Sequence, residues 1–155
     1  MKDKSALLYL ENQLCFPLYA ASRLTTKIYS PYLKKLNITY PQYIVMLVLW
    51  QYNEQSVKEI GERLFLESNT LTPLLKRLEI KKLIKRRRSK EDERTVLVSL
   101  SSKGNKLKEE VLFVPVEIME SFQNSSIKEK ELKTFQETLI NLVGILANKA
   151  TAGQK

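Results

Sequence analysis

Apolar residues recur every three or four positions near both ends of the chain. Near the N-terminus the repeat comprises Leu7, Leu10, Leu14, Leu18 and Ala21. Near the C-terminus it comprises Leu132, Phe135, Leu139, Leu142 and Leu146. A third repeat comprises Leu107, Val111, Val114, Ile118 and Phe122, and it includes Pro115, which should kink or split the helix. This spacing brings apolar side chains onto one helix face, so each stretch predicts an amphipathic helix.

Three capping boxes mark further helix starts. Thr39 with Gln42, and Pro41 in the first turn, predicts a helix from about Thr39 to Tyr52. The apolar run inside it, residues 43–50, is also typical of a buried strand, but the cap and the length favour a helix. Ser56 with Glu59 predicts a short helix to about Leu64, and Ser126 with Glu129 predicts one to about Asn148.

The middle of the chain has the pattern of a winged helix. A break over residues 65–67 precedes another predicted helix, from Ser68 to about Lys81, and two short helices joined by a short turn form a helix-turn-helix. Residues 83–88 and 95–100 then flank the polar stretch 89–93, which predicts a β-hairpin. In a winged helix the second helix enters the DNA major groove and the hairpin reaches an adjacent groove.

The predicted fold is mostly α with a small β-hairpin wing. We assign residues 37–103 to a winged helix-turn-helix, residues 1–36 and 104–150 to a helical dimerisation region, and residues 151–155 to a frayed tail. The apolar helix faces at the two ends could be intrachain core. Long helices flanking a small domain have little core of their own, however, so we expect a homodimer. Its two recognition helices would suit a palindromic operator with half-sites ~34 Å apart.

Charge and composition narrow the function. The 155 residues carry a net charge of +9, of which +6 lies between Lys76 and Arg94, where ten cations face four anions. A basic run can be a solvated face, but here its context favours double-stranded DNA. With no histidine and one cysteine, a Ser-His-Asp triad, a Cys/His zinc finger and an intrachain disulfide are excluded. We expect neither a metal site nor a cofactor.

The N-terminal segment does not have the pattern of a signal peptide, because charges interrupt it. The longest apolar run has eight residues, Tyr43–Trp50, far short of the ~20 needed to span a membrane. We therefore expect a cytoplasmic protein with no membrane partner, in which a lone thiol stays reduced unless it is oxidised.

Four stretches carry a resemblance to a known family. They are Leu10–Tyr19 (LENQLCFPLY), Leu36–Tyr43 (LNITYPQY), Glu67–Leu78 (ESNTLTPLLKRL) and Asp92–Arg94 within SKEDERTVLVSL. The chain resembles the MarR family of winged-helix regulators over about residues 9–147, and within it the one-cysteine branch of the organic hydroperoxide resistance repressors. The Asp-x-Arg pattern is typical of the broad family, whereas Cys15 with the Leu-Asn-x-Thr-Tyr-Pro-Gln stretch is typical of the thiol-sensing branch.

The resemblance implies a set of DNA contacts. Ser68, Thr70 and Thr72 would reach phosphates or base edges from the start of the recognition helix, although all three could simply cap it. The resemblance further implies phosphate contacts from Lys76 and Arg77, backbone contacts from one or two of Arg86, Arg87 and Arg88, and minor-groove insertion of Arg94, oriented by Asp92. Asn69 departs from the family, which has glycine there.

The resemblance also implies a redox sensor made of Cys15, Tyr19, Tyr29 and Tyr40, in which the hydroxyls donate to the thiolate. Tyr19 lies four residues after Cys15, on the same helix face. Tyr29 lies fourteen residues on, ~21 Å along a continuous helix, so it could serve Cys15 only across an antiparallel dimer, as in the family. Without the resemblance, a lone cysteine in an amphipathic helix is more often a small buried hydrophobe.

Two further expectations concern the surroundings of Cys15. Pro17 should kink the helix near Cys15, which could expose the thiol or misplace it against the tyrosines. Phe16, Met46 and Trp50 are candidate walls of a pocket for organic peroxides, or ordinary core residues.

The main hypothesis is a dimeric repressor switched by one thiol. An organic hydroperoxide oxidises Cys15 to sulfenic acid, and a low-molecular-weight thiol forms a mixed disulfide or over-oxidation follows, because the chain has no second cysteine. The alternative is a MarR-type regulator released by a small aromatic ligand, with Cys15 merely structural. A thiol enzyme is the third hypothesis, and neither a histidine nor a second cysteine supports it.

Overall fold

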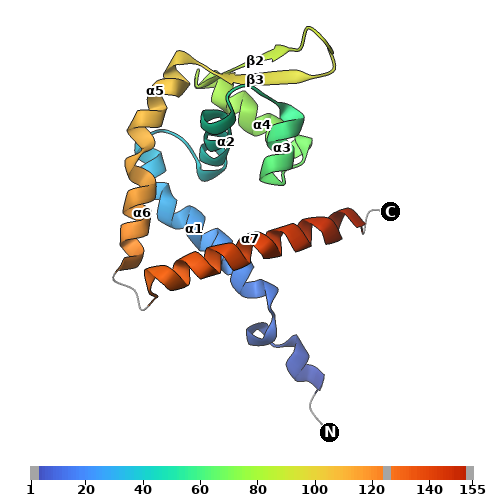
Figure 1. Cartoon of the computed structure of the whole chain (residues 1–155), viewed down its shortest axis with the longest axis vertical. Helices are drawn as coiled ribbons and strands as arrows, with labels where there is room; N and C mark the ends of the chain where they lie inside the picture. Colours follow the sequence, from blue (N-terminus) through green and yellow to red (C-terminus); the bar gives the residue numbers. More distant parts are fainter. Residues whose placement is uncertain (1–3, 124–126, 153–155) are drawn as a thin grey trace.

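A helical frame carries a small lobe that contains the only sheet within the described residues (Figure 1). The computed structural model describes residues 4–123 and 127–152. The frame contains α1 (Cys15–Lys35), α6 (Phe113–Gln123) and α7 (Glu129–Ala152). The lobe contains α2 (Tyr40–Tyr52), β1 (Gln55–Ser56), α3 (Val57–Leu64), α4 (Ser68–Ile80), β2 (Ile84–Arg88) and β3 (Val96–Leu100). Helix α5 (Ser102–Val111) joins the lobe to α6.

The core of the lobe forms around α2, which is a helix as its cap predicted. The Thr39 N–H donates to Gln42 Oε1 at 3.1 Å, which closes one arm of the capping box. Six of the 13 side chains of α2 are buried and three more are half-buried, and this explains why its apolar run has no helical period. They pack against buried residues of the other lobe elements: Ile60, Leu71, Leu75, Leu78, Ile84 and Val98.

The helix-turn-helix and the wing are both confirmed. The Glu59 N–H donates to Ser56 Oγ at 3.1 Å and the Ser56 N–H donates to Glu59 Oε2 at 2.7 Å, so α3 begins at its capping box. Phe65 ends α3 in the left-handed region, at φ 53°. Strands β2 and β3 then pair antiparallel, with Ile84 opposite Leu100 and Arg88 opposite Val96. The sequence did not predict β1, because a two-residue strand has no readable alternation.

The predicted N-terminal helix is wrong before Cys15. Instead, two 3₁₀ turns, η1 (Lys4–Leu8) and η2 (Leu10–Asn12), precede α1. Asn12 Nδ2 donates to the Ala6 carbonyl at 2.6 Å and Gln13 Nε2 to the Leu7 carbonyl at 2.7 Å, so side-chain amides bind carbonyls that a longer helix would use. Pro17 therefore lies in the first turn of α1, where no N–H is needed, and the expected kink at Cys15 is also wrong.

The C-terminal half follows its predicted elements with shifted ends. Leu112 separates α5 from α6, because Pro115 has no N–H to bond the Val111 carbonyl. Ser126 lies outside the described residues. The structure shows a different contact at the start of α7, where the Lys128 N–H donates to Glu131 Oε2 at 2.7 Å. Helix α7 continues to Ala152, so residues 151 and 152 of the predicted frayed tail are helical.

Helix α7 has no buried residue, although it is 24 residues long and amphipathic. In Figure 1 it crosses α1 and lies away from the core of the lobe. Among the helices of residues 4–123 and 127–152, none is long and apolar enough to cross a membrane.

Candidate DNA interface and thiol site

Helix α4 carries the predicted DNA-contact residues outside its buried stripe. Its Leu71, Leu75 and Leu78 are buried in the lobe. Ser68, Thr70, Thr72, Lys76 and Arg77 are all exposed. The N-cap of α4 is Glu67, so capping is not the role of Ser68 here, and the Thr70 hydroxyl donates to Asn69 Oδ1 at 3.2 Å. These side chains stay predicted DNA contacts.

The turn of the wing is organised by Asp92. The Arg94 N–H donates to Asp92 Oδ1 at 3.0 Å, and the Thr95 hydroxyl donates to Asp92 Oδ2 at 2.9 Å. This carboxylate therefore fixes the backbone conformation from which Arg94 extends, and the Arg94 side chain is exposed. In place of a direct ion pair with Arg94, Asp92 positions it through the main chain.

The three consecutive arginines of β2 have different partners. Arg86 Nε donates to Glu79 Oε2 at 2.9 Å, which ties the wing to α4. This hydrogen bond from Arg86 is the largest cause that lowers the pKa of Glu79. Arg87 pairs with Glu54 at 2.7 Å, and Arg88 Nη1 donates to the Glu93 carbonyl at 2.6 Å. The lobe thus holds Arg86 and Arg88, two predicted DNA contacts, in defined orientations.

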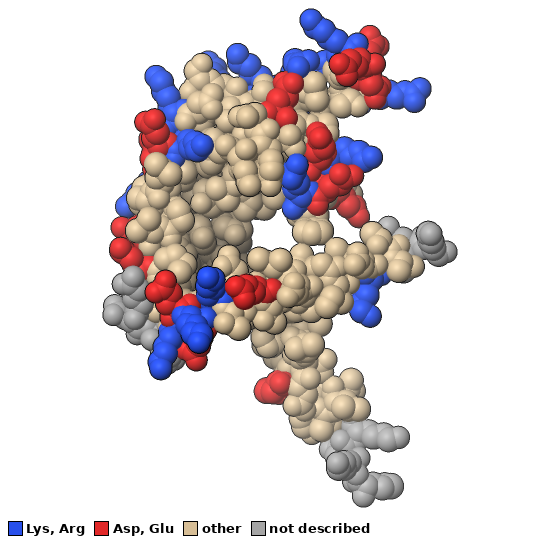
Figure 2. Space-filling model, viewed as in Figure 1, with Lys and Arg blue, Asp and Glu red and all other residues tan. Residues whose placement is uncertain are grey.

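Charge gathers on the lobe more than on the frame. Figure 2 shows Lys and Arg side chains along the upper edge of the molecule, over the wing and the neighbouring helices, with acidic side chains mixed in at the tip of the wing. The visible face of α1 is mostly uncharged, and on α7 charged side chains of both signs gather near its start. This distribution agrees with a DNA-binding lobe carried by an apolar frame.

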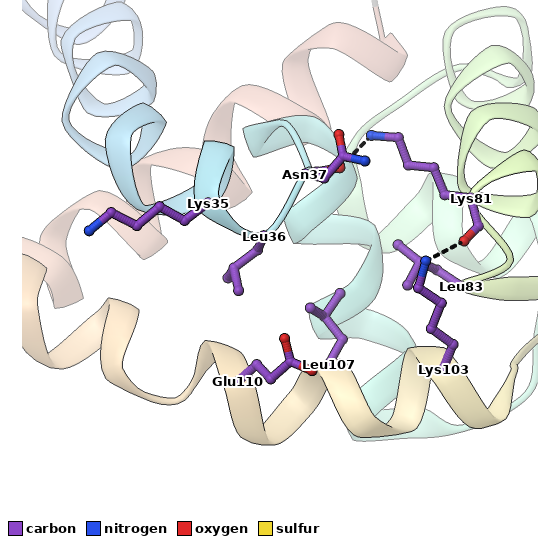
Figure 3. Close-up of a pocket in the computed structure, with 8 residues that line it drawn as sticks. All are labelled: Lys35, Leu36, Asn37, Lys81, Leu83, Lys103, Leu107 and Glu110. Carbon is purple, nitrogen blue, oxygen red and sulfur yellow. Dashed lines mark hydrogen bonds between the residues drawn. The ribbon is translucent and has the colours of Figure 1, made fainter.

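A small cavity of about 160 Å³ lies where α1, α4 and α5 meet (Figure 3). On one wall, Lys81 Nζ donates to the Asn37 carbonyl at 2.5 Å and to Gln42 Oε1 at 3.1 Å. Burial lowers the pKa of Lys81, and the positive charges of Arg77 and Lys103 lower it further. Lys81 therefore braces the end of α4 against the loop between α1 and α2.

Cys15 is exposed and is the first residue of α1. It is thus not a core residue of its own chain. The free N–H groups of a helix's first turn favour a negative charge placed beside them. Tyr19 follows one turn later, is 59% exposed, and accepts a hydrogen bond from Arg23 Nη1 at 3.1 Å. The predicted placement of Cys15 and Tyr19 on one helix is confirmed.

Tyr29 and Tyr40 lie together, away from the Cys15 end of α1. Their ring centroids are 4.9 Å apart in an edge-to-face arrangement. Tyr43 completes a tyrosine cluster, with its centroid 5.9 Å from Tyr29 and 6.2 Å from Tyr40. Helix α1 is unbroken from Cys15 to Tyr29, which keeps these residues ~21 Å apart within one chain.

Burial raises the pKa of all three hydroxyls of the tyrosine cluster above the ordinary value of 10.0. For Tyr29 and Tyr43, contact with neighbouring tyrosines of the cluster raises it further. All three therefore remain protonated at neutral pH. The cluster can donate hydrogen bonds to an anion such as a thiolate or sulfenate.

An apolar groove of about 410 Å³ runs beside Tyr40, between α1 and α7. Its walls are formed by Leu18, Ala21, Ser22, Thr25, Tyr40, Phe135, Leu139, Leu142, Val143 and Leu146. Of the three expected pocket walls, Met46 is buried in the lobe core and Trp50 packs against that core, while Phe16 is exposed. The groove therefore has other walls than those expected.

Sequence reasoning missed two residues next to the predicted site. Tyr43 lies three residues after Tyr40, and that spacing on a helix was the signal that could have found it. Arg23 lies four residues after Tyr19, and its guanidinium carbon is 5.6 Å from the centre of the Tyr19 ring. It is the cation closest to the Tyr19 hydroxyl in the contacts described.

Comparison with known proteins identifies the family. The sequence pattern of the "Transcriptional regulator SarA/Rot" family matches residues 27–111. The organic hydroperoxide resistance transcriptional regulator of Bacillus subtilis is 51% identical over 140 residues, which cover 90% of this chain and 95% of that protein. These relatives are regulators of transcription and not enzymes.

The chain is also similar to solved structures of the regulator AbfR. AbfR of Staphylococcus epidermidis is 36% identical, with a TM-score of 0.75 over 94% of this chain and 96% of AbfR. Reduced AbfR bound to DNA is 38% identical, with a TM-score of 0.73 over 92% of this chain and 97% of AbfR. AbfR has also been solved overoxidized on DNA and in a disulfide-formed state. With its winged lobe, exposed recognition helix and these relatives, the chain belongs to the MarR-type winged-helix transcriptional regulators of the SarA/Rot family.

Proposed function

We propose that the protein is a dimeric repressor that binds a palindromic operator when reduced and leaves it when an organic hydroperoxide oxidises Cys15. The observation that carries this proposal is the combination of an exposed Cys15 at a helix start with a partly buried cluster of protonated tyrosines. The 51% identity with the organic hydroperoxide resistance regulator supports the same function.

The dimer is supported by apolar surface that the chain itself leaves uncovered. Large hydrophobic side chains are exposed on the N-terminal turns, α1, α6 and α7, among them Leu14, Leu24, Ile28, Val116, Met119, Phe135, Ile140 and Ile145. So many exposed large apolar side chains on a set of helices are typical of an interface. A second copy that covers it in an antiparallel arrangement can bring Tyr29 and Tyr40 to the partner subunit's Cys15, which a single chain cannot do over ~21 Å.

The chemistry needs two steps. The Cys15 thiolate attacks the peroxide, forming an S–O bond while the O–O bond breaks, which gives the sulfenic acid. The alkoxide leaves and takes a proton from water to become the alcohol. A low-molecular-weight thiol then attacks that sulfur, forming a disulfide and releasing water. An external thiol is required because the chain has no second cysteine.

The mixed disulfide is the form that we expect to release DNA. Overoxidized AbfR has been solved bound to DNA, so in that relative over-oxidation is compatible with DNA binding. A mixed disulfide adds a bulky group between the subunits, where packed interfaces do not deform continuously. We expect the partner tyrosines to separate and the two winged lobes to lose their half-site spacing.

The proposal is tested by fluorescence anisotropy on a DNA fragment selected from genomic DNA by the reduced protein. Cumene hydroperoxide and free cysteine are added to the wild type and to Cys15→Ser, and mass spectrometry reports the modification of Cys15. We expect the wild type to lose affinity at least about tenfold, the size of an ordinary allosteric coupling, and Cys15→Ser to stay bound. A wild type that stays bound while carrying the mixed disulfide would show that the proposal is wrong.

The groove beside Tyr40 supports a second candidate function, namely a regulator that is released from DNA when a small aromatic ligand binds. Its volume of about 410 Å³ and apolar walls suit such a molecule. The Cys15→Ser variant separates the two, because a ligand-released regulator would respond to the ligand equally well without the thiol. A titration of both proteins with salicylate gives that comparison.

A further inference from the structure

Two aromatic residues of α2 connect the tyrosine cluster to α5. Tyr43 contacts both sensor tyrosines and is only 5% exposed. Its ring centroid is also 6.5 Å from that of Trp50, in an edge-to-face arrangement. The two residues are seven positions apart, so they lie on the same face of α2, two turns from each other. The rings thus form an uninterrupted row along α2.

The row ends on the main chain of α5. Trp50 Nε1 donates to the Gly104 carbonyl at 3.0 Å. The Gly104 main chain lies close against the start of the wing, since a Cβ there would lie 2.0 Å from the Leu83 carbonyl oxygen. The Gly104 N–H also donates to Ser101 Oγ at 3.0 Å, and this hydroxyl in turn donates to the Lys82 carbonyl at 2.6 Å. Trp50 therefore contacts the point where α5 is held against the wing.

Close-packed rings transmit a displacement because the interior around them has no free volume to absorb it. We propose that Tyr43 and Trp50 are positioning residues that pass a movement of Tyr29 and Tyr40 to α5, and so to the wing. This inference rests on the proposed function, since it takes Tyr29 and Tyr40 as the sensor. Helix α5 is where such a movement matters, because it joins β3 of the wing to α6 of the frame.

Trp50 is the only tryptophan of the chain, so its emission reports the far end of the row directly. The full-length reduced dimer is treated with cumene hydroperoxide and free cysteine, and three quantities are followed: Cys15 modification by mass spectrometry, Trp50 emission, and DNA anisotropy. The variants are Tyr43→Leu, which removes the ring, and Tyr43→Phe, which keeps it. Tyr52→Leu is the matched control, because Tyr52 is on the same helix but stacks under Arg63.

In the wild type and in Tyr52→Leu we expect an oxidation-dependent change in Trp50 emission and at least about tenfold weaker DNA binding. In Tyr43→Leu we expect Cys15 to be modified equally, the Trp50 change to disappear, and the loss of DNA affinity to shrink to about threefold or less. Tyr43→Phe should behave as the wild type. A general loss of packing would not give this pattern, because the reduced protein should bind DNA normally in every variant.

The proposed transmission through Tyr43 and Trp50 is overturned if Trp50 emission does not respond to Cys15 oxidation in the wild type. It is also overturned if Tyr43→Leu keeps the full response. The proposed function fails in a distinguishable way, namely if Trp50 emission changes on Cys15 oxidation of the wild type while the protein stays bound to DNA. Should Tyr43→Leu not fold, Trp50→Phe replaces it, since it keeps a ring and removes the N–H donor to Gly104. For this variant DNA anisotropy is the readout. If oxidised Trp50→Phe releases DNA as fully as the wild type does, transmission through Trp50 is overturned.

Discussion

At the scale of single residues, the tyrosine cluster combines donor capacity with burial. A thiolate or sulfenate is stabilised by O–H donors, and a tyrosine serves only while its own proton stays on. Burial raises the pKa of Tyr29, Tyr40 and Tyr43, so their hydroxyls remain donors over the whole physiological range. The cluster is therefore a neutral donor site, in contrast to the charged surface of the wing.

The raised pKa values predict how stability depends on alkaline pH. Well below pH 10 these tyrosines are protonated in both the folded and the unfolded chain, so they contribute no pH dependence there. Above about pH 10 the unfolded chain loses protons that the folded chain retains, and the free energy of unfolding falls as pH rises. Tyr43→Phe removes one such group, so urea unfolding between about pH 9 and 11 should show a shallower fall in the midpoint.

The control for this measurement is Tyr9→Phe, on an exposed N-terminal turn. It should follow the pH profile of the wild type. If both variants flatten the profile equally, burial of the cluster is not the cause of the alkaline loss of stability.

From the sequence, individual candidate residues are easier to name than their neighbours in space. Cys15, Tyr29 and Tyr40 were identified through the family resemblance, and the continuous α1 confirmed that Tyr29 cannot reach Cys15 within one chain. Tyr43 was missed because it stands in an apolar run, although its spacing of three residues from Tyr40 on one helix is a signal for it. The contacts of Asn12 and Gln13 with main-chain carbonyls were also unpredictable, since such local hydrogen bonds depend on where the helix begins.

At the scale of elements, the start of α5 is packed closely against the residue that precedes β2. The Gly104 main chain lies so close to Leu83 that a methyl group must displace backbone, with 2.0 Å to its carbonyl oxygen. We predict that Gly104→Ala lowers the free energy of unfolding by about 2–3 kcal/mol, as overpacking against backbone does. Chemical denaturation with circular dichroism measures this change.

Gly144→Ala is the matched control, because it makes the same substitution inside a helix where the chain itself leaves open space around the glycine. No atom lies within 4 Å of a Cβ built at Gly144, in α7. This variant should gain about 0.5–1 kcal/mol, the ordinary advantage of alanine over glycine in a helix. Equal effects at the two positions would rule out the close approach at Gly104.

Caps and turns explain why most elements were predictable and one was not. The starts of α2 and α3 are set by side chains within four residues of each other, so local sequence is sufficient. Strand β1 exists only because Gln55 and Ser56 meet β3, some forty residues later in the chain, and no local pattern contains that information. The N-terminal apolar repeat had the period of a helix but lacked a cap before Cys15.

At the scale of the whole molecule, the positive charge of the lobe and the apolar surface of the frame should have different roles in DNA binding. DNA affinity should come from the basic wing and α4, where +6 of the net +9 lies, and the frame should set the distance between two lobes. A positive charge on the frame should then contribute little to DNA affinity, although it has the same sign as the charge of the lobe.

Arg94 and Lys149 make this division testable, since each is an exposed cation and they lie on the wing and on α7. Phosphate and groove contacts release counterions, so removing one lowers affinity and reduces the dependence of binding on salt. We predict that Arg94→Gln weakens DNA binding about tenfold and reduces the slope of log K against log salt by about one, whereas Lys149→Gln changes neither. Anisotropy titrations at several salt concentrations measure both quantities. A loss of the same size in Lys149→Gln would mean that the overall charge of the dimer, and not the wing, determines its affinity for DNA.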